Sequence, residues 1–299
     1  MDPGRLGVFY FTEALDGAAL VAFARRLEAL GYGTLWIPEV FGREPFATAG
    51  YLLARCERLR IASGIANVYA RDAVTAAIGQ RTLAELSGGR FLLGLGVSHP
   101  ALVEEPRGHA WGRPVPTMRA YLDRLERAPH QGPAPAEPPP IVLAALGPRM
   151  LELAGARTAG AHPYNMPPAH TAKARQILGP EPWLCVEQKV CLERDPARER
   201  RRARAALAVY LGLPRYHAVW GSLGFSERDW SGGGSDRLID AVVAWGDERA
   251  IRQRIEEHFQ AGASHVCIQP LQPDGGGASA GFASEPPHWR VLEALAPSA

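Results

Sequence analysis

Residues 60–97 read RIASGIANVYARDAVTAAIGQRTLAELSGGRFLLGLGV, and they hold the plainest structural signal in the chain. The stretch begins and ends with apolar runs of strand length, 60–65 and 91–97, that do not alternate with polar residues. Residues 73–86 between them have helical apolar spacing, and the glycines that follow are a C-terminal stop signal. Strands that are apolar on both faces are typical of a parallel sheet covered by helices. The stretch therefore predicts two parallel strands joined by a helix.

The same alternation of strand and helix continues along the rest of the chain. Further apolar runs predict strands at 6–11, 35–38, 141–145, 161–164, 183–192 and 264–269. Helical patterns cover 16–30, 48–55, 73–86, 115–127, 148–156, 168–178, 195–211 and 247–261. Eight such units predict an α/β fold, a single (β/α)8 TIM barrel over residues 1–299, with an open doubly wound sheet as the alternative. Residues 212–245 are too long for a simple connection, and we expect an irregular insertion there that acts as a lid.

Composition and charge exclude several classes of partner. The 33 basic and 31 acidic residues leave a net charge of +2, which gives no electrostatic footprint for nucleic acid or for an anionic membrane. No run reaches 18 apolar residues, and no charged N-terminal region precedes a long apolar one, so we expect a cytoplasmic protein without a membrane span. The four cysteines form no C-x-x-C pair and are expected to be buried free thiols.

In a TIM barrel the active site lies at the C-terminal ends of the strands, so the polar residues after each apolar run are the candidates. These are Thr12, Glu13, Glu39, Asn67, Ser98, His99, Gly147, Arg149, Tyr164, Asn165 and Gln269. The set is poor in histidines and carboxylates, which argues against a metal-dependent hydrolase, and no metal site is expected. A glycosidase pair of Glu13 and Glu39 would need aromatic platforms for a sugar, and Lys189 lies inside a strand, not where a Schiff-base aldolase needs it. A cofactor that brings its own reactivity fits this set best.

Several motifs resemble one family. Residues 63–71 (SGIANVYAR), 81–83 (RTL) and 86–96 (LSGGRFLLGLG) are similar to the central signature of the luciferase-like monooxygenase superfamily. They are most similar to the branch that uses coenzyme F420, a deazaflavin. Residues 31–39, 144–150 and 245–247 match the same family in the same order. The resemblance covers essentially the whole chain and implies a bacterial-luciferase-like barrel that forms a homodimer.

The resemblance also implies where a cofactor binds. Family members have a bulge after the third strand, often with a non-prolyl cis peptide, that supports the back of the ring, and Gly64-Ile65 occupies this place. Gly147-Pro148-Arg149 corresponds to the phosphate site, where N–H groups at a helix start and the Arg149 charge would hold the phosphate. A glycine kept for packing and a plain helix cap are the structural alternatives. The implied cofactor-binding residues are Gly64, Ile65, Asn67, Ser98, Ala145, Gly147, Pro148, Arg149, Tyr164 and Asn165.

The proton donor is less clearly indicated. Many deazaflavin relatives carry Asp-His or Glu-His after the second strand, but here Glu39 is followed by Val40. The catalytic candidates are therefore Glu39, His99 and Glu13. The two glycines in residues 94–96 are expected to let the ring approach the fourth strand.

We expect hydride transfer between F420 and a C=C, C=N or C=O group of a small, mostly apolar substrate. Phe41, Tyr69, Trp111 and residues 212–245 are expected to form the substrate pocket. The first alternative is an FMN-dependent monooxygenase that uses O2, although that branch usually carries longer insertions. The second is a flavin-binding paralogue without catalytic activity.

Overall fold

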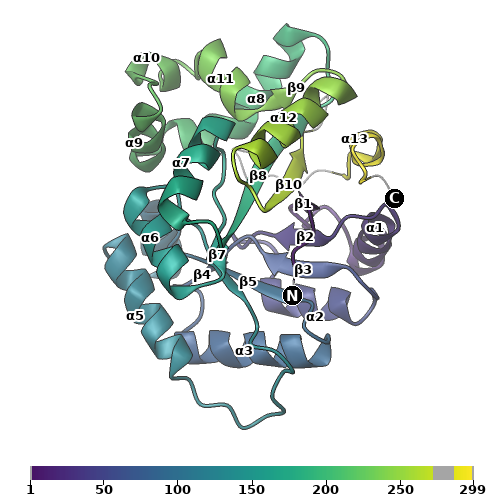
Figure 1. The fold of residues 1–299 in the computed structure, drawn as a ribbon, viewed down its shortest axis with the longest axis vertical. Helices are drawn as coiled ribbons and strands as arrows, with labels where there is room; N and C mark the ends of the chain where they lie inside the picture. The colour runs from purple at the N-terminus through teal and green to yellow at the C-terminus, as the bar shows by residue number, and fades with distance from the viewer. Residues whose placement is uncertain (1, 272–285, 298–299) are drawn as a thin grey trace.

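The computed structural model describes residues 2–271 and 286–297, and its centre is a closed barrel of eight parallel strands (Figure 1). Within these ranges the sheet has ten strand segments: β1 (Leu6–Phe9), β2 (Thr34–Ile37), β3 (Arg60–Ser63), β4 (Ala66–Asn67), β5 (Phe91–Gly96), β6 (Ile141–Leu143), β7 (Gly160–Ala161), β8 (Trp183–Cys191), β9 (Ala244–Trp245) and β10 (His265–Pro270). The segments β3 and β4 form one barrel strand beside β5, and β9 adds only to the end of β8, so the barrel itself has eight. They pair in the order β10-β1-β2-β3-β5-β6-β7-β8-β9, β4 pairs with β5, and a further parallel pairing of β10 with β8 closes the barrel. The predicted TIM barrel is confirmed, and the open sheet is wrong.

Helices surround the barrel, as the alternating pattern predicts. They are α1 (Gly17–Ala29), α2 (Pro45–Leu53), α3 (Ala73–Leu86), α4 (Pro100–Arg107), α5 (Pro114–Glu126), α6 (Pro148–Arg157), α7 (Pro168–Leu178), α8 (Pro196–Leu211), α9 (Pro214–Ser222), α10 (Glu227–Trp230), α11 (Asp236–Val242), α12 (Glu248–Gln260) and α13 (Trp289–Ala294). The eight helices expected from the sequence are all present, with ends that differ by a few residues. Helix α4 is an addition, because it is short and contains Pro106, which argues against a helix in a sequence pattern.

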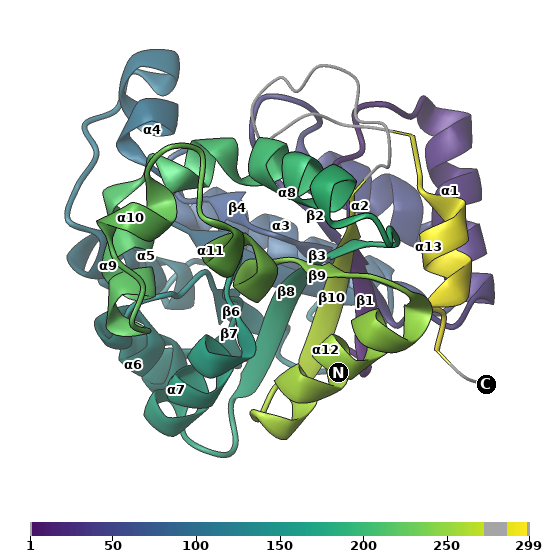
Figure 2. The ribbon, with the colours of Figure 1, turned by 90° about the horizontal axis from the view of Figure 1, so that it is seen from above.

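Residues 212–245 are folded rather than irregular, which corrects the sequence-based expectation. They form α9, α10 and α11, whose nine, four and seven residues are too few for a periodic pattern to stand out. A capping box between Ser226 and Asp229 begins α10, and the Ser235 side chain caps α11. These helices lie together with α8 (Figure 2), and Trp220 is fully buried in a second core between them. The segment is therefore a packed layer of helices above the barrel.

A bulge interrupts the strand line between β3 and β4. Ala62 pairs with Leu92 before it and Ala66 pairs with Leu95 after it, so this side has one residue more than β5. The peptide between Gly64 and Ile65 within the bulge is cis, as the family resemblance implies. The bulge thus lies where the resemblance predicts it.

The glycines of β5 make room for this bulge. A Cβ atom at Gly94 would lie 2.1 Å from the carbonyl oxygen of Ser63, and one at Gly96 would lie 2.3 Å from Cδ1 of Ile65. Both contacts are far shorter than real Cβ contacts, so a larger residue at either position would force the bulge to shift. The glycines therefore have a packing reason of their own, and the expectation that they let a cofactor ring approach the strand stays a prediction, with Gly96 in the pocket lining.

Aromatic side chains fill the inside of the barrel and support its floor. Phe9, Phe11 and Trp36 belong to one buried cluster there. The Trp36 indole N–H donates to Nε2 of His265 at 2.9 Å, which holds the indole in place. The four cysteines are free and buried, as predicted.

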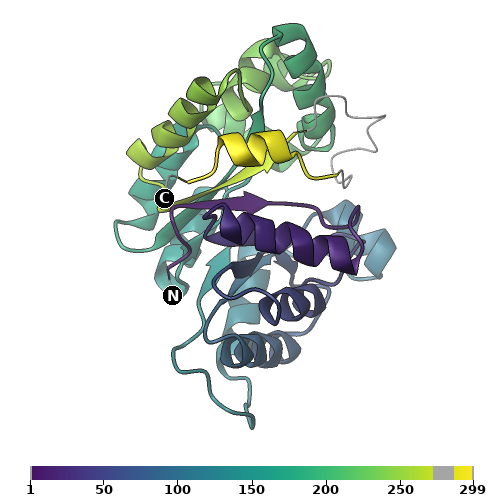
Figure 3. The same ribbon diagram turned by 90° about the vertical axis from the view of Figure 1, so that its right-hand side faces the viewer.

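The C-terminal helix completes the outer layer beside the first helix. Figure 3 shows α13 lying along α1, where the Arg26 guanidinium packs 4.0 Å over the Trp289 ring and pairs with Glu293. The Tyr32 hydroxyl donates to the carbonyl of Leu292 at 2.8 Å. None of the helices in the described ranges is both long enough and apolar enough to cross a membrane.

Candidate active site

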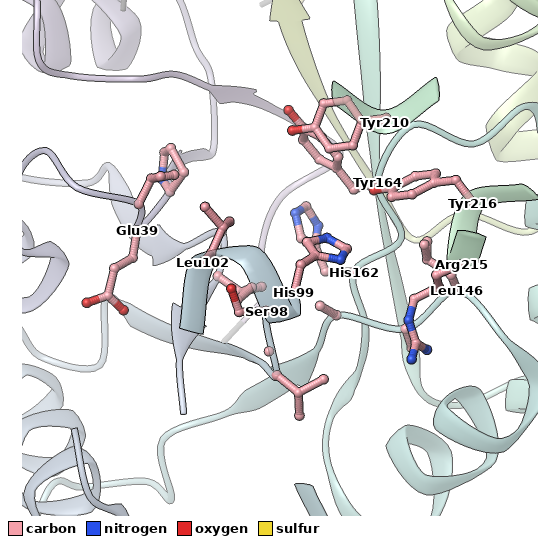
Figure 4. Close-up of a pocket in the computed structure, with 18 of the residues that line it drawn as sticks. Glu39, Ser98, His99, Leu102, Leu146, His162, Tyr164, Tyr210, Arg215 and Tyr216 are labelled. Atoms are coloured by element: carbon pink, nitrogen blue, oxygen red, sulfur yellow. The ribbon is translucent and has the colours of Figure 1, made fainter. Parts of the chain in front are cut away.

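A pocket opens at the C-terminal ends of the barrel strands, where this fold places active sites (Figure 4). The bulge contributes to one side of its lining, and Tyr164, Tyr210 and Tyr216 contribute an aromatic side. The sequence-predicted residues that line it are Glu39, Gly64, Ile65, Ser98, His99, Ala145 and Tyr164. Seven residues predicted from the sequence are thus found in the pocket lining. Their contacts indicate which of them can take part in binding or chemistry.

Glu39 is held in a clamp that leaves it little freedom to donate a proton. Its carboxylate accepts two hydrogen bonds from the Arg71 guanidinium, at 2.9 and 2.5 Å, and a third from the backbone N–H of Asn67 at 2.6 Å. The two side chains of this ion pair are only 8% and 10% exposed. Figure 4 shows the carboxylate pointing away from the aromatic side of the pocket. The geometry therefore favours a structural role for Glu39, which ties the end of β2 to the loop after β4.

Glu13 lies outside the pocket, which corrects its place among the catalytic candidates. Its side chain is exposed and lies against Gly42, where an added Cβ would meet Oε1 at 2.0 Å. Asn67 is buried, but its side chain accepts a hydrogen bond from the N–H of Tyr69 in a local turn and does not line the pocket. Neither residue lines this pocket.

Residues 147–149 lie beside the pocket at the N-terminus of α6. Gly147 is the N-cap, it has no side-chain cap, and an added Cβ would meet no atom within 4 Å. Pro148 begins the helix, and Arg149 is exposed and makes no hydrogen bond or ion pair within the described residues. Leu146 and Met150 on either side do line the pocket. An open helix N-terminus and an unpaired cation thus flank the site, which is the arrangement that binds anions.

Ser98 and His99 follow β5 directly. Ser98 adopts the left-handed backbone, with φ of 55°, which turns the chain into α4. The His99 ring packs 6.4 Å from the ring of Tyr216. Burial lowers the pKa of His99, and the nearby charge of Arg215 lowers it further. His99 is therefore neutral at pH 7 and free to accept a proton.

Arg215 is a cation that the sequence pattern did not single out. It is the second residue of α9, so the folded segment 212–245 brings it to the pocket. Burial lowers the pKa of its guanidinium, and it forms no hydrogen bond or ion pair with the residues described. A cation without a protein partner at a pocket is suited to an anionic group of a bound molecule.

The expected substrate pocket is only partly right. Phe41 is 60% exposed, the Trp111 indole donates to the carbonyl of Val97, and the Tyr69 hydroxyl accepts from Gly112. None of the three aromatic residues lines the pocket. The contribution of residues 212–245 is real, since Arg215 and Tyr216 come from that segment.

Beneath the aromatic side lies a buried polar network that sequence reasoning missed. Lys189 donates to Glu187 at 3.3 Å and to Oε1 of Gln269 at 3.0 Å, and the Tyr164 hydroxyl donates to the same oxygen at 2.8 Å. Burial raises the pKa of Glu187 and lowers that of Lys189, while each charge opposes the shift of the other. The Lys189 ammonium also lies 4.0 Å from the centre of the Tyr164 ring. The network fixes the tyrosine that faces the pocket.

Asn165 belongs to this support and not to the pocket lining. It has a left-handed backbone with φ of 58°, and its N–H donates to Glu187 at 2.9 Å. A signal for the network exists in the sequence: Glu187 and Lys189 are two apart in a strand, so both point to the same face. Opposite charges two residues apart inside a buried strand indicate an internal ion pair.

His162 is a second residue that sequence reasoning missed. The expected strand at 161–164 placed it in a strand interior, but β7 ends at Ala161, so His162 stands at a strand end and lines the pocket. Its side chain is 2% exposed and stacks on Trp36, with 4.3 Å between ring centres. Only a more accurate strand boundary would have found it.

Comparisons with known proteins agree with this geometry. Residues 2–265 match the family described as luciferase-like monooxygenase. The 5,10-methylenetetrahydromethanopterin reductase of Methanolobus tindarius is 25% identical over 84% of this chain and 90% of its own length.

Two solved structures share the fold. An F420-dependent secondary alcohol dehydrogenase, in complex with an F420-acetone adduct, superposes with a TM-score of 0.73 at 14% identity over 99% of both chains. The FMN-bound oxygenating constituent of 3,6-diketocamphane monooxygenase from Pseudomonas putida superposes with a TM-score of 0.64 at 14% identity, over 98% of this chain and 97% of its own. Because the family model matches residues 2–265, this chain belongs to the luciferase-like monooxygenase family.

Proposed function

We propose that this oxidoreductase transfers a hydride between coenzyme F420 and a C=C, C=N or C=O group of a small, mostly apolar substrate. The observation that carries the proposal is the chemistry of the pocket lining. Among the described residues that line it, Glu39 is the one carboxylate and is bound by Arg71, while most other side chains are apolar or aromatic. Such a lining offers a protein-borne proton but no electron source, so a bound cofactor must supply the redox chemistry.

The residues present fit a flavin-type cofactor. The N-terminus of α6 and the unpaired Arg149 and Arg215 flank the pocket and are suited to a phosphate. A buried ring nitrogen of His162 has no partner within the described chain and can face a polar edge of the ring. When bound, a deazaflavin supplies a two-electron hydride at its C5 carbon.

The side chains of the protein handle the proton and limit the access of water. His99 is neutral and can accept a proton when the substrate is oxidised. When the substrate is reduced, the ring would first take a proton from solvent and then pass it to the substrate. Tyr164, Tyr210 and Tyr216 form an aromatic side that limits water around the substrate. The buried network below Tyr164 keeps this side rigid.

F420 is preferred over FMN because the F420-dependent structure superposes better than the FMN-bound one, with TM-scores of 0.73 and 0.64. A monooxygenase that uses FMN and O2 is the second candidate, since the same helix N-terminus and arginines would hold the FMN phosphate. The two candidates differ in which ring the pocket prefers.

Equilibrium titration tests the proposal. The protein has seven tryptophans, and Trp36 lies under His162 at the pocket, so cofactor binding should quench the intrinsic fluorescence. We expect F420 to bind at least about tenfold more tightly than FMN, a difference of roughly 1.4 kcal/mol. Tighter binding of FMN would favour the monooxygenase, and binding of neither would refute the proposal.

Two variants check the phosphate site in the same assay. Arg149→Ala and Arg215→Ala should each weaken cofactor binding by about ten- to a hundredfold, since each removes a charge-assisted contact. Arg58→Ala is the matched control, because the Arg58 side chain is 73% exposed, does not line the pocket and pairs with its neighbour Glu57 at 3.9 Å. Affinities equal to that of the control would place the phosphate elsewhere.

A further inference from the structure

His162 is mounted rigidly in the barrel. Its backbone N–H donates to the carbonyl of Leu143 at 2.8 Å, which extends the pairing of β7 with β6 by one residue. Its ring lies almost parallel to the Trp36 indole, at an angle of 6°, and also parallel to Phe9 at 6.1 Å. The indole below is itself fixed by its bond to His265. The imidazole therefore has a defined orientation at the pocket.

The hydrogen bonds of the ring determine which nitrogen carries the proton. Nδ1 lies 2.8 Å from the carbonyl oxygen of Cys185, and a carbonyl oxygen can only accept, so Nδ1 carries the hydrogen. Burial lowers the pKa of His162 to about 4, although the Cys185 carbonyl opposes the shift and His265 adds to it. The ring is therefore neutral at pH 7, and Nε2 presents a lone pair.

Nε2 has no partner among the described residues. The atom is buried, and the residue lines the pocket. A buried acceptor without a donor is unfavourable, and native structures rarely keep one unless a bound molecule or water satisfies it. The pocket thus presents an acceptor-only contact at its inner end.

We infer that Nε2 of His162 accepts a hydrogen bond from the imide N–H on the pyrimidine ring of the bound cofactor. The inference rests on the proposed function, in that a flavin-type ring must occupy this pocket. The imide N–H is common to deazaflavins and flavins, so the assignment holds for F420 and for FMN. The open N-terminus of α6 and Arg215 would bind the phosphate on the side chain of the cofactor. The ring system would then extend into the pocket toward His162.

A matched pair of variants separates the two nitrogens. In His162→Asn the side-chain amide can replace Nδ1 and keep the bond to Cys185, but no acceptor remains near Nε2. In His162→Gln the longer side chain can place an oxygen near Nε2 but loses the Cys185 bond. Circular dichroism first verifies that both variants are folded. Fluorescence titration with F420, and separately with FMN, then gives the dissociation constants.

We expect His162→Asn to weaken binding of the preferred cofactor by about tenfold or more, and His162→Gln to stay within about threefold of the wild type. A merely structural role would give the reverse order, because only the Asn variant keeps the internal bond. That reverse order, or equal affinities in all three proteins, would overturn the inference.

A cofactor methylated at the imide nitrogen supplies an independent readout. Methylation and His162→Asn remove the same hydrogen bond, so their losses in affinity should overlap rather than add. Full additivity would mean that His162 meets another group and would overturn the assignment. Failure of the wild type to bind either unmodified cofactor would instead refute the proposed function, so the two failures are distinguishable.

Discussion

Replacing Glu39 by glutamine separates a structural clamp from a proton donor. The Glu39 carboxylate accepts three hydrogen bonds, two from Arg71 and one from the N–H of Asn67. A glutamine keeps the shape but offers a single acceptor atom, and its amide N–H groups would face the donors of Arg71. The guanidinium is 10% exposed and would keep Glu44 as its charged partner among the described residues.

The magnitude follows from this burial. Removing one partner of a buried ion pair typically costs about 3–5 kcal/mol, because the other charge stays buried without compensation. Glu44→Gln is the matched control, since it removes the other carboxylate that contacts Arg71 but at 49% exposure, where a pair contributes about 0–1 kcal/mol. The free energy of unfolding, measured by urea titration, should therefore fall several times more for Glu39→Gln than for Glu44→Gln.

Activity gives the second half of the test. If Glu39 is a structural clamp, the pH dependence of kcat in Glu39→Gln should match that of the wild type, even if a less ordered pocket lowers kcat itself. Equal stability of the two variants, together with loss of turnover in Glu39→Gln alone, would refute the clamp and restore Glu39 as the proton donor.

Three further predictions concern the buried charges and the bulge. Lys189→Met should lower the free energy of unfolding by about 3–5 kcal/mol, and the double variant with Glu187→Gln should recover most of it, as urea titration would show. Burial raises the pKa of Glu199 to about 8, so the folded protein keeps a proton that the unfolded chain loses near pH 4.5. The contribution of Glu199 to stability should thus fall by about 1.4 kcal/mol per pH unit between about pH 5 and 8, while buried histidines such as His162 have lowered pKa values and contribute the opposite slope below about pH 6.5. The difference in stability between the wild type and Glu199→Gln, followed by urea titration at each pH, should therefore change by about that amount per pH unit. Gly96→Ala should weaken cofactor binding by about tenfold or more in fluorescence titration because its Cβ displaces Ile65. Gly221→Ala, whose added Cβ would meet only Trp230 at 3.9 Å and which does not line the pocket, should leave affinity within about twofold.

The barrel could be predicted because its signal is local and repeated. Parallel strands buried on both faces leave continuous apolar runs, and each helix leaves its own spacing, so strand β5 and helix α3 are readable without their neighbours. Short helices such as α4 and α9 carry too few turns for this. The cis peptide at Gly64–Ile65 was implied by the family resemblance and not by the residues themselves.

The candidate site was predictable only as far as strand ends reveal it. Glu39 is correctly placed at the pocket, but its partner Arg71 lies 32 residues further on and comes from another loop, so no local pattern indicates the ion pair. His162 was hidden by a strand end misplaced by a few residues. Arg215 reaches the pocket through the packing of a second core, which depends on contacts far apart in sequence.

Anaerobic single-turnover mixing examines the hydride transfer itself. The protein loaded with oxidised F420 is mixed with secondary alcohols, amines and saturated ketones, and the reduced complex is mixed with ketones, imines and enones. We predict that at least one pair changes the absorbance of the bound ring without O2, and at the same rate when air is admitted. No absorbance change with any compound, together with substrate-dependent O2 uptake by the protein and reduced FMN, would contradict hydride transfer through the deazaflavin.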